Sequence, residues 1–368
     1  MSRRYDWTVT VGSGATDITN CVQTIDIEFG RRLRTDSWQS NNANISGVFP
    51  SSLPSLQIGT WVQINAYQNG VLKYYYFGTV ANYSIDYGIV QNMDTWSMTV
   101  EDIFGVLGRT TWSGSITAQT AVYKSMIRLG TLCNVSFEQV TPTPAYDGIP
   151  TQALTGDGTA AMDTFNQLAN TSQVVPYAIG LDSLDVRALN YSSPGVGIEF
   201  TDTTPVDTSI AAKFDQIEIG ALADTYASQV TVRPEGLAEQ TVGTPPRSWV
   251  IPTYDSTTSH ALSTATDLAS TLDRTPNQPL SISCLGEQQT TDAVIQMCQW
   301  QGYDAGHSYG ININFRGNKY TCYVEGGHIS ATPQSTRFNF YLTKIATNYW
   351  AFQLDSSLFG VLDQNYLG

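Results

Sequence analysis

Charge is scarce in this sequence, and it leans to one sign. Only 14% of the 368 residues are charged, well under the roughly 25% of an ordinary soluble domain. The 18 basic residues stand against 32 acidic ones, which gives a net charge of −14. Binding to the nucleic-acid backbone needs clustered lysine and arginine, so this composition argues against a protein that grips DNA. An acidic wall past which DNA slides stays compatible with it, because such a wall repels phosphate.

Paired cysteines and long apolar runs are also missing. The five cysteines are odd in number, scattered and without metal-type spacing, which indicates reduced, mostly buried thiols in a protein made in a cytoplasm. They are Cys21, Cys133, Cys284, Cys298 and Cys322. No stretch approaches the roughly 20 apolar residues of a membrane span, and the first residues lack the apolar core of a signal peptide. We therefore expect no membrane anchor.

Motifs for catalysis and metal binding are absent as well. No phosphate-binding loop, nucleophile elbow, zinc-protease helix or Cys-x-x-Cys pair occurs, and the chain has three histidines. Cys322, Glu325 and His328 form the most suggestive group. Residues three apart on a strand point to opposite faces, however, and would chelate a metal poorly. We interpret the group as a strand end, and expect no enzyme activity, no cofactor and no metal.

Two local patterns leave alternatives open. Arg31, Arg32 and Arg34 form the only dense basic cluster, and a solvated turn is favoured over a partner contact there. The stretch Lys73–Phe77 places aromatic residues on both faces of a strand. That pattern indicates either a strand buried on both sides or one that meets a neighbouring subunit.

The sequence does contain one motif twice, which we call the repeated phrase. A Trp-led, strand-like run followed by Phe-Gly-Val-Leu closes the first hundred residues and returns at the end of the chain. The residues are Trp96, Phe104, Gly105, Val106 and Leu107, and then Trp350, Phe359, Gly360, Val361 and Leu362. A two-residue hairpin signal precedes each copy, Asn69-Gly70 and Gly317-Asn318. The same order in both halves predicts one β domain used twice, and so favours an architectural protein.

The remaining patterns divide the chain into three parts. Residues 1–110 are predicted to be all-β, with Ile25, Ile27 and Phe29 on one face of an alternating strand. Residues 111–205 predict a small α+β insert with helices at 117–129 and 159–169 and a hairpin at 174–189. Residues 206–368 predict β structure again, with a helix at 260–273 and a short one at 292–300. The fold class is therefore mainly β with small α+β parts.

In this order of elements the chain resembles the tail-hub (baseplate-hub) minor tail proteins of long-tailed bacteriophages. The resemblance covers nearly the whole chain and rests on the overall pattern. The resemblance is carried by residues 22–34, 59–80 and 96–109 in the N-terminal part, and by residues 261–284, 310–324 and 359–368 in the C-terminal part.

The resemblance implies two tail-tube-like β-barrels, 1–110 and 206–368, the second with an inserted α+β segment at about 255–305. The Trp, Phe, Gly, Val and Leu residues of the two copies would close each barrel. It also implies a homotrimer whose six barrels form a ring in the virion tail tip. This ring would join the sixfold tail tube to a threefold tip and leave an acidic-walled channel for DNA and the tape-measure protein.

The implied partners are a distal tail or tube protein above the ring and a tip or spike protein below it, after synthesis in the host cytoplasm. The alternative function is a receptor- or carbohydrate-binding module of the tail tip. A cell-wall hydrolase is a third candidate, but the sequence leaves no spare domain for one.

Overall fold

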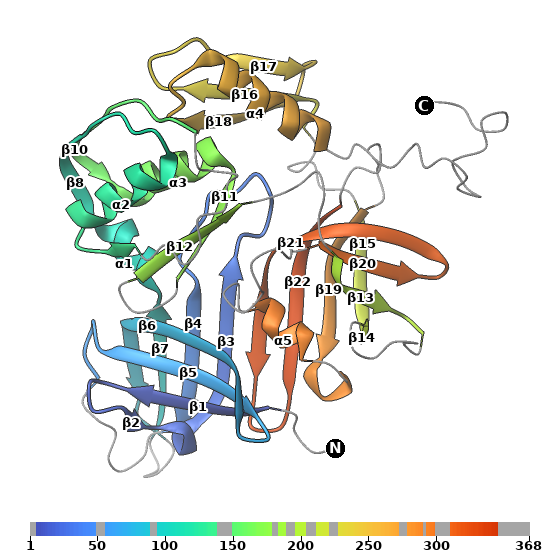
Figure 1. Cartoon of the computed structure of the whole chain (residues 1–368). Coiled ribbons are helices and arrows are strands. Elements are labelled where there is room, and N and C mark those ends of the chain that lie inside the picture. The colour runs from blue at the N-terminus through green and yellow to red at the C-terminus, as the bar shows by residue number, and fades with distance from the viewer. Residues whose placement is uncertain are drawn as a thin grey trace.

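We analysed a computed structural model of the chain. It describes residues 5–48, 56–88, 94–137, 149–178, 183–188, 196–203, 211–220, 227–271, 278–289, 292–298 and 310–344. The protein is mainly β, as predicted, and one 14-stranded sheet runs through it (Figure 1). Cys133, Cys284, Cys298 and Cys322 are buried, as expected of apolar thiols.

The first part of the large sheet comes from the N-terminal residues. Its strands are β1 (Asp6–Val11), β2 (Thr16–Asp17), β3 (Val22–Gly30), β4 (Asn42–Val48), β5 (Trp61–Gln68), β6 (Val71–Asp86) and β7 (Thr95–Glu101), with a 3-10 turn η1 (Thr19–Cys21). They lie in the order β3-β4-β7-β6-β5-β1, each antiparallel to its neighbour. The predicted alternation holds, since Ile25, Ile27 and Phe29 all face the core.

The second part comes from the C-terminal half. It contains β13 (Val196–Thr201), β14 (Ala211–Lys213), β15 (Gln216–Gly220), β19 (Gln278–Leu285), β20 (Gly310–Phe315), β21 (Asn318–Ala331) and β22 (Thr336–Lys344), with η2 (Gly286–Gln288) and helix α5 (Ala293–Cys298). The strands lie in the order β15-β19-β22-β21-β20-β13-β14. The ladders from β15 to β20 are antiparallel, and the last two are parallel.

Both predicted hairpins form, one of them in a slightly different place. Asn69 and Gly70 take positive φ angles of 51° and 76° between β5 and β6, as a tight turn requires. In the second hairpin the turn residues are Arg316 and Gly317, with φ of 50° and 79°. Asn318 already pairs with Phe315, so the turn lies one residue earlier than predicted.

The middle of the chain forms a small α+β part, called the insert below, which begins within the 1–110 stretch that was predicted to be all-β. Its elements are α1 (Ile103–Arg109), β8 (Thr111–Ile116), α2 (Val122–Leu132), β9 (Ser136–Phe137), β10 (Leu154–Ala160), α3 (Ala161–Ser172), β11 (Val174–Ala178) and β12 (Ser183–Ala188). The two helices and the β11–β12 hairpin are confirmed. The first helix begins later than predicted, after Ala121 rather than Thr117.

A second small unit packs a helix on its own three-stranded sheet (top of Figure 1). It consists of β16 (Gln229–Pro234), β17 (Gln240–Gly243), β18 (Ser248–Thr253) and α4 (Thr258–Thr271). Its core is formed by Val230, Val232, Ile251, Ala261, Ala265, Leu268 and Tyr323. The unit therefore starts ahead of the predicted segment at about 255–305, because β19 and α5 belong to the large sheet and its core.

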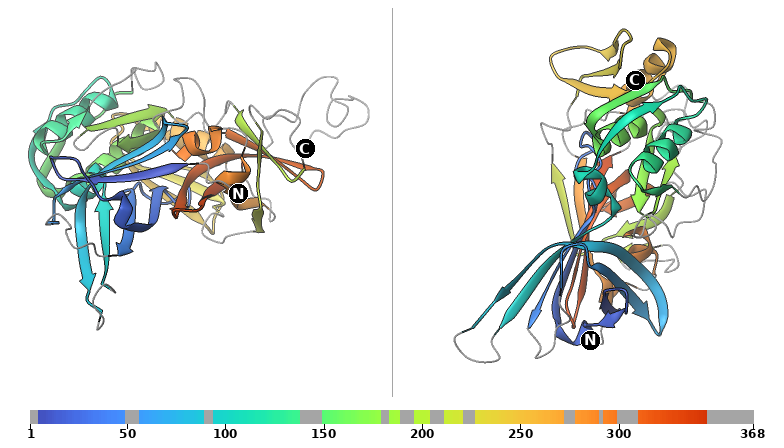
Figure 2. Two further views of the ribbon diagram at one scale, coloured as in Figure 1. Left: turned by 90° about the horizontal axis from the view of Figure 1, so that it is seen from below. Right: turned by 90° about the vertical axis from the view of Figure 1, so that its left-hand side faces the viewer.

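The two parts of the large sheet are joined along β3 and β21, where residues 25–30 pair antiparallel with residues 326–331. Beyond that ladder the first part curls, and its strands fan apart in Figure 2. Among the described residues no ladder connects β1 back to β3, so we see an open, curled sheet in place of the expected closed barrel.

Candidate interaction surface

The large sheet has one apolar face and one polar face. Along β3, β4 and β7, every second residue is buried in the common core, and the residues between them are half-buried or exposed. The residues on this open face are mostly serine, threonine and asparagine, among them Thr24, Asn44, Ser46, Ser97 and Thr99. Its charges on β3 and β15 are acidic, namely Asp26, Glu28 and Glu218. Arg337 of β22 lies on the same face, opposite Ser330, and pairs with Asp215 at 2.8 Å. The face is therefore polar and carries more acidic than basic side chains on these strands.

The first copy of the repeated phrase lies where the first sheet meets the α+β insert. Trp96 is buried in β7, and its Nε1 donates to the Val48 carbonyl at 2.9 Å. Phe104 to Leu107 form part of helix α1, and Phe104 packs on Phe165 of α3 with ring centroids 5.9 Å apart. The run ends in a helix because Asp102 caps it, accepting the Phe104 N–H at 3.0 Å. The second copy, Trp350 and Phe359 to Leu362, lies outside the described residues.

The joint between β3 and β21 contains a buried ion pair that sequence reasoning did not find. Arg31 contacts Glu325 at 2.8 Å, and the two side chains are only 7% and 3% exposed. The guanidinium also lies 4.4 Å from the ring centroid of Trp38. Arg34 is buried too. The solvated turn favoured for this cluster is therefore wrong for Arg31 and Arg34, which are interior, and applies only to the exposed Arg32.

The group Cys322, Glu325 and His328 is split up, partly by a register shift of β21 between Val324 and Gly326 that puts Cys322 and His328 on opposite faces. Cys322 faces the core, Glu325 pairs with Arg31, and His328 Nε2 lies 3.4 Å from Asp26 on the open face. No cluster of three or more metal-ligating side chains occurs in the described part of the chain. No helix found there is long and apolar enough to cross a membrane.

One buried Asp–His pair has the residue types of a catalytic dyad. Asp255 is fully buried, accepts from Thr253 Oγ1 at 2.6 Å and contacts His260 Nδ1. Both partners lie around the start of α4, and the neighbouring Tyr254 N–H donates to Thr171 Oγ1 of α3 at 2.8 Å. The Tyr254 bond attaches the small unit to the insert, whereas the Asp255–His260 contact lies within the small unit and holds the start of α4 to the end of β18.

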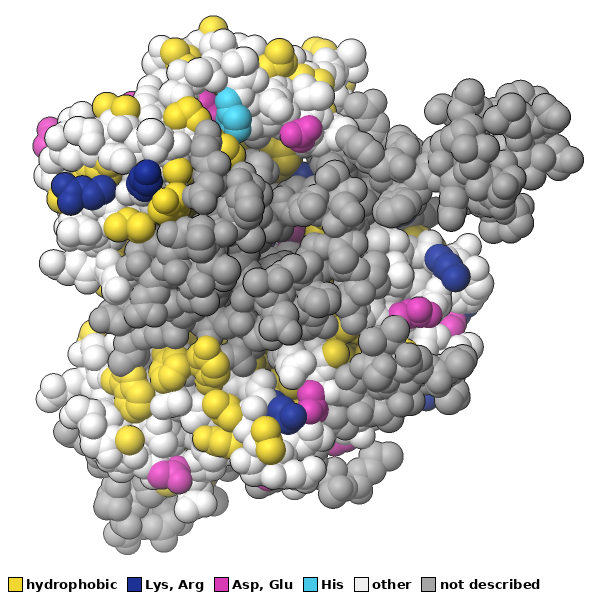
Figure 3. Space-filling model, viewed as in Figure 1, with side chains coloured by type: hydrophobic (Ala, Val, Ile, Leu, Met, Phe, Trp, Pro, Cys, Tyr) yellow, Lys and Arg dark blue, Asp and Glu magenta, His cyan; other side chains and the backbone are white. Residues whose placement is uncertain are grey.

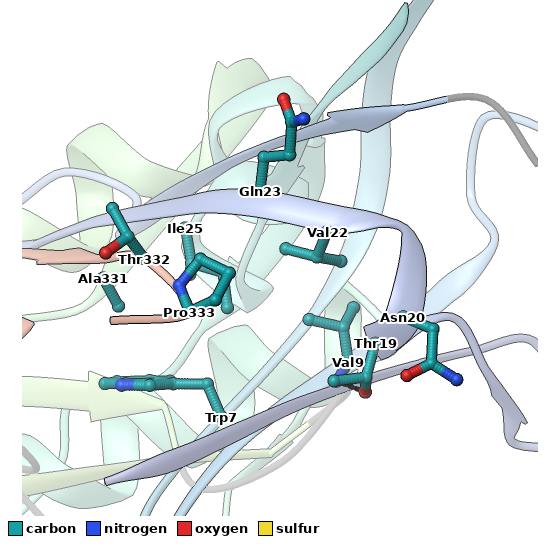
Figure 4. Close-up of a pocket in the computed structure, with 10 residues that line it drawn as sticks. All are labelled: Trp7, Val9, Thr19, Asn20, Val22, Gln23, Ile25, Ala331, Thr332 and Pro333. Atoms are coloured by element: carbon teal, nitrogen blue, oxygen red, sulfur yellow. Dashed lines mark hydrogen bonds between the residues drawn. The ribbon is translucent and has the colours of Figure 1, made fainter. Parts of the chain in front are cut away.

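A cavity of about 290 Å³ marks the seam between β1 and β3, where a closed barrel would have a ladder. Trp7 lies along one side of it and Pro333 along the other (Figure 4). Its other lining residues are Val9, Thr19, Asn20, Val22, Gln23, Ile25, Ala331 and Thr332. None of these side chains titrates near neutral pH, so the cavity lacks the groups for acid–base or metal chemistry.

The two parts of the sheet share one strand order. The run β3-β4-β7-β6-β5-β1 corresponds to β15-β19-β22-β21-β20-β13, strand for strand. The register corresponds as well: Ile45 lies opposite Met98 as Ile282 lies opposite Phe340. The last ladder differs, antiparallel in the first run and parallel in the second. The correspondence in strand order and strand direction is therefore complete for five strands.

A second surface feature is an aromatic ladder on β5 and β6. Trp61 and Phe77 have ring centroids 6.4 Å apart, and Phe77 and Tyr75 5.3 Å apart. All three are half-buried, whereas Tyr74 and Tyr76 between them face the core. Hydrophobic side chains gather over this region at the lower left of Figure 3. Lys73–Phe77 is therefore not fully buried on both sides: Tyr75 and Phe77 on its outer face are half-buried, and Lys73 there pairs with Asp292 at 2.7 Å.

Comparison with known proteins yields structural relatives only. No family model matches the sequence, and no curated protein matches it either. A tail protein from Neisseria meningitidis superposes with a TM-score of 0.63 at 14% identity, over 93% of this chain and 97% of that one. A prophage MuSo2 tail protein from Shewanella oneidensis gives 0.58 at 10% identity, over 92% and 98%. A Listeria monocytogenes prophage tail protein gives 0.51 at 10%, over 91% and 94%.

These matches extend over nearly the full length of both chains. The chain thus has the fold of phage tail proteins, and the resemblance expected from its sequence is confirmed at the level of fold.

Proposed function

We propose that the chain is a structural virion protein of a phage tail tip, a homotrimeric hub that joins a sixfold tail tube to a threefold tip. The observation that carries the proposal is the shared strand order within a fold common to phage tail proteins. Two similar units per chain, taken three times, supply six units to a ring, which is the symmetry match such a joint needs. The role is structural rather than enzymatic.

In this proposal the tube-like units are 1–110 and 206–368, with the insert 111–205 beside them. The sheet that runs unbroken through β4, β3, β21 and β22 would face the channel with its polar side. Asp26, Glu28 and Glu218 then contribute to a net acidic wall, along which DNA and the tape-measure protein pass without being held. A distal tail or tube protein above and a tip or spike protein below complete the set of partners.

Native mass across a concentration series, followed by electron microscopy, tests the hub. A trimer that appears as a ring with a central hole supports it. A strict monomer that also fails to form rings with a tail-tube or distal tail protein overturns it, and a basic or neutral lumen in an assembled ring overturns the acidic-wall part alone.

The aromatic ladder favours a second candidate, a receptor- or carbohydrate-binding module. Trp61, Tyr75 and Phe77 lie beside Gln63, whose Nε2 donates to Oδ1 of the buried Asn65 at 2.9 Å, and aromatic faces next to an amide suit sugar rings. A glycan array tests it. A reproducible saccharide signal that Trp61→Ala abolishes supports this function, and its absence at high protein concentration opposes it.

A further inference from the structure

We propose that neighbouring copies of this chain join edge to edge, with the last residues of β6 in one copy pairing with β15 of the next. This inference rests on the proposed ring and deepens it by naming the strands that close the ring. It follows from a joint that exists once inside the chain and whose two counterparts have no partner strand among the described residues.

The joint inside the chain uses the second half of β21. This strand leaves a tight turn, pairs with β20, and shifts register between Val324 and Gly326. Beyond the shift, β20 no longer runs alongside, and residues 326–331 pair with β3 in its place.

Strand β6 repeats this design. It also leaves a tight turn, pairs with β5 only as far as Thr79, and shifts register between Val80 and Asn82. Beyond the shift it continues along β7, with Tyr83 opposite Met98 as Gly327 is opposite Phe340. Among the described strands, none pairs with residues 82–86 on the side that β5 has left.

The counterpart of β3 is also open along one edge. By strand order it is β15, whose only ladder among the described strands is with β19. Sheet edges of this kind are templates for pairing with another chain. One copy therefore carries both halves of a joint, β6 and β15, at opposite ends of its sheet.

Residues at the two open edges are less buried than the corresponding residues of the existing joint. Ile27 and Ile329 face each other in the existing joint, and both are 0% exposed. Their counterparts Ile219 and Ile85 are only partly buried, and Tyr83 is 41% exposed. Pairing β6 with β15 of a second copy would cover these apolar side chains.

Two different edges meet in this contact, so it runs head to tail and each copy offers one edge to each neighbour. Such a contact closes into a ring if the rotation fits. Six like units, with joints alternately inside and between chains, close after three copies. The occupant of each edge is therefore a second copy of this chain.

Counting from the register shift aligns individual residues. Ser330 lies opposite Asp26 in the existing joint, and the equivalent pair between copies is Asp86 opposite Glu218. Residues directly opposite each other on antiparallel strands have Cα atoms about 4.5–5.5 Å apart, which lies within the roughly 4.4–6.8 Å that a disulfide spans between Cα atoms.

Disulfide trapping tests the contact. The full chain carries Cys21→Ser, to remove the one cysteine that is not buried, together with Asp86→Cys and Glu218→Cys. After mild oxidation we expect covalent dimers and trimers with nothing larger, because the third bond closes the ring. The matched control is Asp26→Cys with Ser330→Cys, which should form an internal disulfide at the existing joint.

A second variant keeps the proposal falsifiable without oxidation. Ile219→Lys places a charge on the β15 edge and should raise the dissociation constant of the trimer at least tenfold. Leu262→Lys, on the exposed side of α4 (44% exposed), should leave it unchanged. Circular dichroism and thermal melts confirm that both variants are folded.

The outcomes separate the two proposals. A native trimer that Asp86→Cys with Glu218→Cys does not trap, while the internal control does form, overturns the edge pairing and leaves the trimer standing. Dimers trapped by Asp86→Cys alone indicate a twofold contact and overturn it too. A strict monomer at every concentration and with tail partners present overturns both the ring and its edges.

Discussion

Ile27 and Ile329 lie opposite each other in the ladder that joins β3 to β21, and neither side chain is exposed. They come from opposite ends of the chain, so one antiparallel ladder makes the two halves of the sheet a single structure. The joint thereby links the stability of one half to that of the other.

Ile329→Ala should lower the free energy of unfolding by about 2–5 kcal/mol, the usual result of emptying a buried aliphatic site. Because the ladder is shared, both halves should still unfold in one transition, now at lower denaturant. Chemical denaturation followed by tryptophan fluorescence and circular dichroism measures this. Ile219→Ala on the open edge is the control and should change a monomer by less than about 1 kcal/mol; equal losses at both positions would contradict this account of the joint.

Phe104 of α1 packs against α3 and should contribute strongly to the stability of the fold. It is 3% exposed and packs on Phe165, so Phe104→Ala should cost about 3–5 kcal/mol. If the repeated phrase marks equivalent core positions, Phe359→Ala should cost a similar amount. Thermal and urea denaturation of both variants checks this, and near-neutral stability at both sites would refute the equivalence.

Asp102 should make stability fall as pH rises. Burial raises the pKa of its carboxyl to about 7, against the lowering effect of hydrogen bonds from Ser40 and from backbone N–H groups. The folded state therefore holds a proton that the unfolded state, with a pKa near 3.9, releases. That stabilisation is complete at about pH 4 and is lost towards pH 7, a change of up to about 4 kcal/mol.

Asp102→Asn is the test, because asparagine keeps a cap for α1 but does not titrate. Urea melts between pH 4.5 and 8 should show a flatter stability curve for this variant than for the parent chain. Parallel curves would mean that Asp102 titrates normally in the folded protein.

The buried pair of Arg31 and Glu325 should behave as a unit. Glu325→Met leaves the guanidinium buried without its carboxylate and should cost about 3–5 kcal/mol. Adding Arg31→Met removes the orphaned charge, so the double variant should recover most of that loss. A double-mutant cycle from denaturation curves measures the coupling, and simple additivity of the two single losses would contradict it.

The proposed contact between copies places Asp86 opposite Glu218, and like charges facing each other across strands are unfavourable. Asp86→Asn should therefore tighten the trimer a few-fold at low salt. The advantage should shrink at high salt, since salt screens exposed charges. Sedimentation at two salt concentrations measures both effects, with Asp157→Asn, exposed on β10, as the control; no gain for Asp86→Asn would argue against this register.

The local patterns of the sequence determined most elements of this protein. Alternation placed Ile25, Ile27 and Phe29 in the core, apolar periodicity placed α3 and α4, and Asn69-Gly70 placed a hairpin. These features depend on residues near each other in the chain. The second turn was misplaced by one residue because Arg316, a residue with no preference for positive φ, occupies the turn.

Contacts between distant residues were decided only by the tertiary structure. Arg31 and Arg34 lie in a stretch whose sequence resembles a solvated turn. Arg31 is buried because the fold places Glu325, almost 300 residues later in the chain, beside it. Three features have no local signal in the sequence: the ladder between β3 and β21, the open seam beside Trp7, and the edges of β6 and β15 that no described strand pairs with. Strand pairing at that separation is fixed by which apolar faces the folded chain can bury together, and no stretch of sequence records that by itself.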